Sequence, residues 1–195
     1  MNIVSCPIAP YDGFVTVARQ WLRDNSMNYH IRQAKPEEFQ LFGAIERAAS
    51  KAFIEAGLPE IASHEPTDIK FIKANARSGV VFVSVLNDNP VGFILAAPLD
   101  RPFHIFELSV HPDHGRKGMG RSLVESVCDW ARENGSKSVT LSTFRDIVWN
   151  APFYASCGFK IIPEDEWTPA LLLAHYHEDD IGLPLDRRCF MRKDL

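Results

Sequence analysis

Cysteine is scarce in this 195-residue chain, and its placement excludes several classes of protein. The four cysteines, Cys6, Cys128, Cys157 and Cys189, are scattered and form no C-x-x-C pair. Small secreted domains are held together by closely spaced cysteines, and cysteine-based zinc sites need paired ones. We therefore expect neither a disulfide framework nor a metal site of this kind, and a reduced cytoplasmic protein fits the pattern best.

Long apolar runs are also absent, and neither charge sign strongly predominates. No stretch approaches the ~20 apolar residues that span a bilayer, and no basic segment followed by an apolar one marks a secretory signal at the N-terminus. Lys and Arg number 21 against 25 Asp and Glu, a net charge of −4, which leaves no basic footprint for nucleic acid. We expect a cytoplasmic protein with neither a membrane nor a nucleic-acid partner.

The chain does contain alternating strand and helix patterns that indicate an α/β protein with a mixed sheet (α+β). We expect strands at residues 29–34, 80–86, 91–97, 103–110, 138–144, 159–162 and 188–193. We expect helices at residues 36–57 and 65–79, and a third that begins in the glycine-rich segment after residue 115 and ends at residue 134. Two further helices are expected, one within 149–157 and one at 168–177. The "NDNP" segment at 87–90 predicts a hairpin with an atypical turn because of Pro90. A central strand–helix–strand crossover follows it.

The first 28 residues differ from the rest. "FVTVARQWL" at 14–22 places its apolar residues at helical spacing. We therefore divide the chain into an N-terminal helical extension, 1–28, and one domain, 29–195. The extension docks on the domain or, as the alternative, forms the contact of a homodimer.

Glycines and basic residues are concentrated where one strand is expected to end and a helix to begin. The junction "GRKGMGRS" holds Gly115, Gly118 and Gly120 together with three basic side chains. A helix N-terminus presents unpaired N–H groups and a partial positive charge, which suit phosphate. The junction therefore predicts a ligand with a pyrophosphate. The P-loop string is absent, and the dinucleotide fingerprint fails at Leu123.

Two motifs here resemble those of the GNAT superfamily of N-acetyltransferases. "VHPDHGRKGMGRSLV" resembles the acetyl-CoA signature [RQ]-x-x-G-x-[GA], with Gly115 in place of Arg or Gln and Arg116 one position later. "WNAPFYASCGF", residues 149–159, is similar to the family's second signature. The resemblance implies a GNAT-like acyl-CoA N-acyltransferase fold with acetyl-CoA as cosubstrate. The residues that it implies for cofactor binding are Leu108, Val110, Gly115, Arg116, Lys117, Gly118, Met119, Gly120, Arg121, Ser122, Asn150 and Phe153.

Within this set the resemblance assigns two particular contacts. The family holds the thioester oxygen with the main chain of the strand at 103–110, so the N–H of Val110 aligns with the oxyanion donor. Asn150 matches the asparagine that contacts the pantetheine amide.

Glu107 is the candidate general base. Strand alternation puts it on one face with Phe103, Ile105 and Ser109, where burial would raise its pKa toward neutrality. Several family members have a glutamate in this strand. The alternative is that Glu107 lies at a bulge or at the sheet edge and is only solvated. His104, which alternation places on the opposite face, and His111 are the alternatives, because histidine titrates near neutral pH.

Tyr154 matches the tyrosine that often lies near the sulfur of CoA. A phenol has a pKa of about 10 and a thiol of about 8.5, so a hydrogen bond to the departing thiolate suits it better than complete proton transfer. The catalytic candidates are therefore Glu107 and Tyr154.

These observations predict an N-acetyltransferase that moves the acetyl group of acetyl-CoA to the primary amine of a small molecule, by direct attack in a ternary complex. The alternatives are a protein acetyltransferase acting on a lysine or an N-terminus, and a catalytically silent CoA-binding regulator. The segment "HYHEDD" at 175–180 has metal-compatible groups, but we interpret it as a solvated helix end and expect no metal. "LDRRCFMRK" at 185–193 is basic, which indicates a strand with an exposed face.

Overall fold

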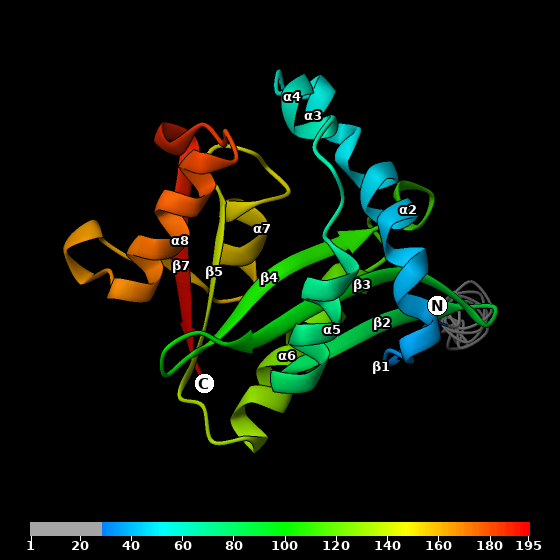
Figure 1. Cartoon of the computed structure of the whole chain (residues 1–195). Coiled ribbons are helices and arrows are strands. Elements are labelled where there is room, and N and C mark those ends of the chain that lie inside the picture. The colour runs from blue at the N-terminus through cyan, green and yellow to red at the C-terminus, as the bar shows by residue number, and fades with distance from the viewer. Residues whose placement is uncertain (1–28) are drawn as a thin grey trace, which may run out of the picture.

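The computed structural model describes residues 29–195, which form a mixed sheet of seven strands in the order β1-β2-β3-β4-β5-β7-β6 (Figure 1). The predicted helix at 14–22, and with it the dimer contact, lies outside the described residues. The strands are β1 (Tyr29–Gln33), β2 (Val80–Leu86), β3 (Asn89–Pro98), β4 (Phe103–Val110), β5 (Ser138–Phe144), β6 (Lys160–Ile161) and β7 (Arg188–Asp194). Neighbouring strands are antiparallel except β4 and β5, which are parallel. The predicted mixed sheet and its crossover are confirmed.

Helices cover both faces of the sheet. They are α2 (Phe39–Ser50), α3 (Ala52–Glu55), α4 (Pro59–Ala62), α5 (Ile69–Ser78), α6 (Met119–Glu133), α7 (Ala151–Ser156) and α8 (Pro169–Asp180), with short 3-10 turns η1 (Pro36–Glu38), η2 (Pro112–His114), η3 (Glu164–Glu166) and η4 (Leu185–Arg187). One core forms where α6 and α7 meet the sheet, and a second where α2 and α5 cover its other face. None of the helices within residues 29–195 has the length and apolarity needed to cross a membrane.

The single helix predicted over 36–57 is divided. A 3-10 turn opens it, α2 ends at Ser50, and α3 begins at Ala52. The hydroxyl of Ser50 donates to the carbonyl of Arg47 at 3.2 Å, and such back-bonding competes with the helical ladder. The prediction of one continuous helix is therefore wrong.

The predicted hairpin joins β2 and β3. Asn87 and Asp88 occupy the turn with φ of 49° and 62°, the left-handed geometry of a two-residue turn between antiparallel strands. Pro90 is outside the turn and pairs with Val85 beside a register shift in β2. The hairpin is confirmed, and the atypical turn expected from Pro90 is not found.

A bulge in β4 decides which side chains share a face. Leu95 pairs with Glu107 but the next residue, Ala96, pairs with Ile105, so Phe106 is an extra residue without a partner. Paired residues on antiparallel strands project to the same face. Glu107 therefore lies with Leu95 on the face covered by α2 and α5, whereas Ile105 packs in the core under α6.

The prediction that Glu107 shares a face with Phe103 and Ile105 is consequently wrong. The same bulge brings His104 to the face of Glu107, contrary to the expectation from alternation. A bulge was the alternative for Glu107, and the structure has one, but Glu107 is half-buried there rather than only solvated.

The sheet divides between β4 and β5. Their parallel ladder joins Phe103 to Val139 and ends with Ile105 and Leu141, whereas β5 continues to pair with β7 as far as Phe144. Figure 1 shows β4 diverging from β5 beyond this point. The C-terminal part of β4 therefore has a free edge on the side that faces β5.

Candidate active site

The free edge of β4 directs backbone N–H groups into the opening. The N–H of His111 donates to the carbonyl of Val91 on β3 at 2.8 Å. Because successive N–H groups along a strand point in opposite directions, those of Leu108 and Val110 point away from β3, toward the side where β5 has separated. The N–H of Val110 thus has the direction required of the predicted oxyanion donor.

Glu107 is half-buried beside this edge, on the other face of β4 from Leu108. Its Oε1 accepts a hydrogen bond of 2.7 Å from the hydroxyl of Ser109. Burial, and after it the negative charge of Glu46 on α2, raises the pKa of Glu107 from its ordinary value to about 7. A carboxyl group with such a pKa exchanges its proton near neutral pH, as a general base should.

Tyr154 approaches from α7, on the other side of the opening. Its side chain is 8% exposed and its ring packs edge-on against Phe153 and Phe159. Burial and the nearby charge of Glu107 raise the pKa of Tyr154 above the ordinary phenol value. The phenol is therefore protonated at neutral pH and is a hydrogen-bond donor.

The glycine-rich junction forms the turn from η2 into α6. Gly118 is the N-cap residue of α6 with φ of 86°, a left-handed conformation. The first helical bond runs from the N–H of Ser122 to the carbonyl of Gly118 at 3.0 Å, so the N–H groups of Met119, Gly120 and Arg121 precede the helical ladder. This arrangement suits a phosphate group.

The predicted basic residues of the junction differ in their surroundings. Arg116 is exposed, with a φ of 57° that is unusual for a residue other than glycine. Lys117 is exposed too, and its Nζ donates to the carbonyl of Asp113 at 2.9 Å. Arg121 donates to the carbonyl and the hydroxyl of Ser156 at the end of α7, at 3.0 and 2.8 Å. Arg116 and Lys117 are thus the side chains that remain accessible for an anion, while Arg121 fastens α6 to α7.

Gly115 and Ser122 are the remaining predicted residues of this junction. Gly115 has φ of −61° and ψ of 162°, ordinary extended backbone, so its conformation does not require glycine. The hydroxyls of Ser122 and Tyr29 are hydrogen-bonded at 3.0 Å, which ties β1 to the start of α6.

The two predicted signatures meet in space. A Cβ added at Gly120 would lie 3.6 Å from the ring of Phe153, so the first turn of α6 contacts α7 directly. Asn150, the N-cap residue of α7, donates through Nδ2 to Thr143 at 2.9 Å. Its Oδ1 is buried without a hydrogen-bond partner among residues 29–195. An unpaired buried acceptor is costly, and the amide N–H of a pantetheine arm is a group that would satisfy it.

The two histidine alternatives are held elsewhere. His104 is 4% exposed, its Nδ1 is 2.9 Å from the hydroxyl of Thr140, and burial lowers its pKa to about 4. His111 accepts a weak hydrogen bond of 3.4 Å from the N–H of Asp113 at the start of η2. His104 is therefore neutral and hydrogen-bonded to Thr140, and His111 stabilises the turn at the start of η2.

Sequence reasoning missed a buried ion pair near the opening. Arg188 on β7 donates to both carboxylate oxygens of Glu178 on α8, at 3.0 and 2.7 Å, and to the hydroxyl of Ser142. The two side chains are 12% and 11% exposed. The interpretation of 175–180 as a solvated helix end is therefore wrong for Glu178, and the exposed face expected for 185–193 does not include Arg188.

Glu46 was missed too, although the sequence holds a signal for it. It lies one helical turn after Phe42 on α2, so a carboxylate interrupts the apolar stripe that also contains Ile45. Both of its carboxylate oxygens accept from the N–H of Thr67, at 3.1 and 3.0 Å, and the hydroxyl of Thr67 donates at 3.2 Å.

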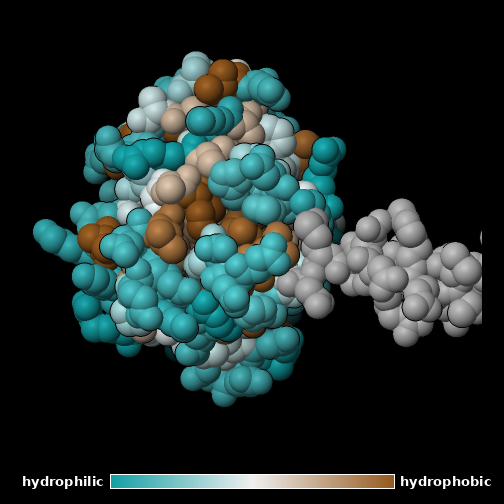
Figure 2. All heavy atoms as spheres, turned by 90° about the vertical axis from the view of Figure 1, so that its right-hand side faces the viewer, coloured by the Kyte–Doolittle hydropathy of each residue, from teal (hydrophilic) through white to brown (hydrophobic). Residues whose placement is uncertain are grey.

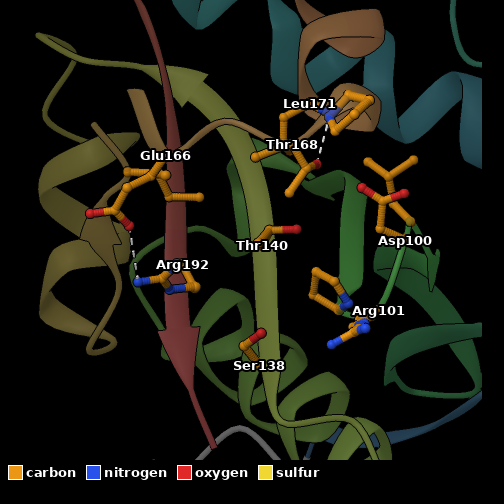
Figure 3. A pocket seen from close by; sticks show the side chains of 12 residues that line it. Asp100, Arg101, Ser138, Thr140, Glu166, Thr168, Leu171 and Arg192 are labelled. Atoms are coloured by element: carbon orange, nitrogen blue, oxygen red, sulfur yellow. Dashed lines mark hydrogen bonds and ion pairs between the residues drawn. The ribbon is translucent and has the colours of Figure 1, made fainter. Parts of the chain in front are cut away.

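A separate pocket of about 500 Å³ lies at the opposite end of β4 and β5 (Figure 3). Asp100 and Arg101, before β4, face Ser138 and Thr140 at the start of β5, and Arg192 contacts Glu166 at its rim at 3.5 Å. None of the predicted site residues lines it. By contrast, the C-terminal end of β4 points toward the face drawn in Figure 2, where hydrophobic residues gather at the centre of a hydrophilic rim.

Comparison with known proteins assigns the chain to a family. The model of the acetyltransferase (GNAT) family matches residues 42–159, more than half of the 195 residues. N-acetyltransferase 8 of Homo sapiens is 30% identical over 100 residues, which are 48% of this chain and 44% of that protein. The chain thus spans less than half the length of this curated relative.

Solved structures show the same fold. An acetyltransferase of the GNAT family from Staphylococcus aureus Mu50 has a TM-score of 0.64 and 18% identity, over 86% of this chain and 99% of that chain. PaiA N-acetyltransferase from Thermoplasma acidophilum, solved in complex with coenzyme A, has a TM-score of 0.60 and 17% identity, over 87% of this chain and 100% of that chain. With the matched family model, this fold establishes that the chain belongs to the acetyltransferase (GNAT) family.

Proposed function

We propose that this protein transfers the acetyl group of acetyl-CoA to the primary amine of a small molecule. The observation that carries the proposal is the position of Glu107 and Tyr154 on the two sides of the opening between β4 and β5, beside the glycine-rich turn into α6. The charge of Glu107 raises the pKa of Tyr154, so the two groups lie within electrostatic reach of each other. The scattered cysteines support a cytoplasmic location as part of the proposal.

The junction and α7 would hold the cosubstrate. The N–H groups of Met119, Gly120 and Arg121, with Arg116 and Lys117, would bind the pyrophosphate. Asn150 Oδ1 would accept from the pantetheine arm, and the N–H of Val110 would donate to the thioester oxygen. Acetyl-CoA supplies the acyl group on a thiol that can leave.

The transfer then needs one proton acceptor and one hydrogen-bond donor. Glu107 takes the proton of the acceptor ammonium, and the neutral nitrogen attacks the thioester carbon. The carbon–sulfur bond breaks while Tyr154 donates a hydrogen bond to the departing thiolate. The attacking nitrogen loses its second proton, which the thiolate takes up, so the products are the amide, CoA as the free thiol, and the one proton first taken by Glu107. The raised pKa of Tyr154 supports hydrogen bonding rather than full proton transfer.

A small acceptor is supported by the aromatic contacts around the end of β5. Phe53 on α3 lies 5.4 Å from the ring of Phe144 and 6.1 Å from that of Trp149. These contacts tie α3 to the loop after β5 and narrow the approach from that side. A panel of small amines, lysine peptides and N-terminal peptides, with thiol release as the readout, tests this choice. Faster release with peptides than with every small amine contradicts a small-molecule acceptor.

The cosubstrate assignment predicts thermal stabilisation by acetyl-CoA. At about 100 times Kd, ligand binding stabilises the native state by about 2.7 kcal/mol, which raises Tm by roughly 5–10 °C in a chain of this size. Gly118→Ala should remove most of this shift, because a side chain is strained at φ of 86° and would crowd the turn.

Gly135→Ala is the matched control for that experiment. Gly135 has φ of 80° and no atom within 4 Å of an added Cβ, so the variant carries the same backbone strain away from the junction. It should lower the starting Tm but keep the shift caused by acetyl-CoA. Wild-type protein whose Tm does not respond to acetyl-CoA contradicts the cosubstrate assignment.

Tyr154→Phe is expected to lower kcat by about 10- to 100-fold, since a hydrogen bond to a charged group contributes about 1.5–3 kcal/mol. Thiol release at saturating acetyl-CoA measures the effect. Tyr176→Phe is the control, because Tyr176 is 61% exposed on α8. A Tyr154→Phe rate equal to that of the wild type would show that Tyr154 is only a core residue.

A further inference from the structure

Glu46 and Glu107 lie on the same face of the sheet, held there by packing between α2 and the hairpin of β3 and β4. Phe42, one turn before Glu46, stacks on Phe93 with the ring centroids 4.3 Å apart. Phe93 pairs with Ser109, and Ser109 donates its hydroxyl to Glu107. The helical turn after Phe42 therefore carries Glu46 over the same face of β4.

The carboxylate of Glu46 is held in one orientation. The N–H and the hydroxyl of Thr67, in the segment before α5, donate to its two oxygens. Hydrogen bonds to a carboxylate favour its charged form. Glu107 accepts from the hydroxyl of Ser109 and from the backbone N–H of Leu108. Burial raises the pKa of both carboxyl groups, and the bonds from Thr67 oppose this rise at Glu46, whereas the charge of Glu46 adds to the rise at Glu107. When the two groups compete for one charge, we therefore take Glu46 as the one that ionises first and Glu107 as the one that keeps its proton.

We propose that Glu46 is a positioning residue for acetyl transfer: its carboxylate, fixed by Thr67 on the face of Glu107, makes Glu107 basic enough to hold the proton taken from the acceptor amine at neutral pH. This inference rests on the proposed function. The charged groups that act on Glu107 are Glu46 from α2 and Arg188 from β7, with Tyr154 of α7 as its titratable neighbour. Burial contributes most to the raised proton affinity of Glu107; of the two charged groups, Glu46 adds to it and Arg188 opposes it.

The test is the pH dependence of kcat/KM in Glu46→Gln, measured by thiol release with one acceptor amine for all variants. Removing the neighbouring charge should lower the pKa of Glu107 and so shift the acidic limb of the kcat/KM profile to lower pH by about one unit. The variant is then several-fold faster than wild type at about pH 6 and equal to it within about threefold on the plateau above about pH 8. Glu46→Asp keeps the charge and should restore the wild-type midpoint, while Glu133→Gln, an exposed residue at the end of α6, should change nothing.

A structural role for Glu46 gives a different result. It would lower the plateau, or Tm, without moving the midpoint, and that outcome overturns the proposal. Carbon-13 NMR can also follow the titration of the Glu107 carboxyl group without any substrate. Its resonance is assigned as the carboxyl signal that disappears in Glu107→Gln. A midpoint that falls in Glu46→Gln supports the proposal even if no amine is acetylated, in which case the proposed function alone fails. An unchanged midpoint overturns the role of Glu46 whether or not the enzyme turns over.

Discussion

Glu107→Gln is expected to reduce kcat/KM by roughly 100- to 1000-fold at about pH 8, within the usual range for loss of a general base. Glutamine has the shape of glutamate and can still accept a hydrogen bond from the hydroxyl of Ser109, but it cannot take up a proton. In the wild type, the pKa of Glu107 is raised to about 7, so kcat/KM should rise with pH through neutrality and then level off. Thiol release at a series of pH values measures both effects.

The stability of the Glu107→Gln variant separates a chemical effect from unfolding. A carboxyl whose pKa is higher in the folded than in the unfolded protein favours folding while it is protonated, and this contribution is lost as pH rises from about 4.5 to about 7. Glutamine never ionises, so the variant should be at least as stable as wild type at about pH 8. A variant that is folded and still has wild-type activity removes Glu107 as the base.

Glu178→Gln is expected to cost about 3 kcal/mol of unfolding free energy, because it leaves Arg188 charged and poorly paired inside the protein. The pair is 11–12% exposed, and Arg188 also lies over the ring of Phe144, 4.7 Å from its centroid. For a chain of this length the loss corresponds to a fall in Tm of roughly 6–12 °C. Urea and thermal unfolding at neutral pH measure it.

The exposed pair between Arg132 and Asp129 is the matched comparison. It has a similar distance, 2.7 Å, but its side chains are 53% and 69% exposed, so Asp129→Asn should cost less than about 1 kcal/mol. The double replacement Glu178→Leu with Arg188→Met should recover much of the loss, since it leaves no unpaired charge. Equal losses of unfolding free energy in Glu178→Gln and Asp129→Asn would contradict the prediction that burial makes breaking the Arg188 pair more costly.

The order of helices and strands could be predicted because each element has its own local pattern. The strand at 103–110 and the helix ending at Asn134 and Gly135 were predicted nearly to the residue. The break at Lys51 was not, since it depends on a serine bonding to its own helix. Residues 1–28 and the possible homodimer remain predictions.

The candidate site was predictable only where it consists of contiguous residues. The glycine-rich turn and the segment 149–159 could be recognised, because backbone conformation and spacing within a few residues define them. The contact of Gly120 with Phe153 and the hydrogen bonds of Arg121 to Ser156 needed the structure, since these partners are distant in the chain.

By itself, the sequence determined the mixed α/β order, the glycine-rich turn with its free N–H groups, and the presence of a carboxylate and a tyrosine near it. Only the tertiary structure decided on which face of β4 that carboxylate lies, because the bulge at Phe106 arises from pairing with β3. It also decided that Glu46 acts on Glu107 and that Arg188 is paired with Glu178. Periodicity records the environment of a single element, whereas charge and burial at this site come from α2, β4, α7, α8 and β7 packed together.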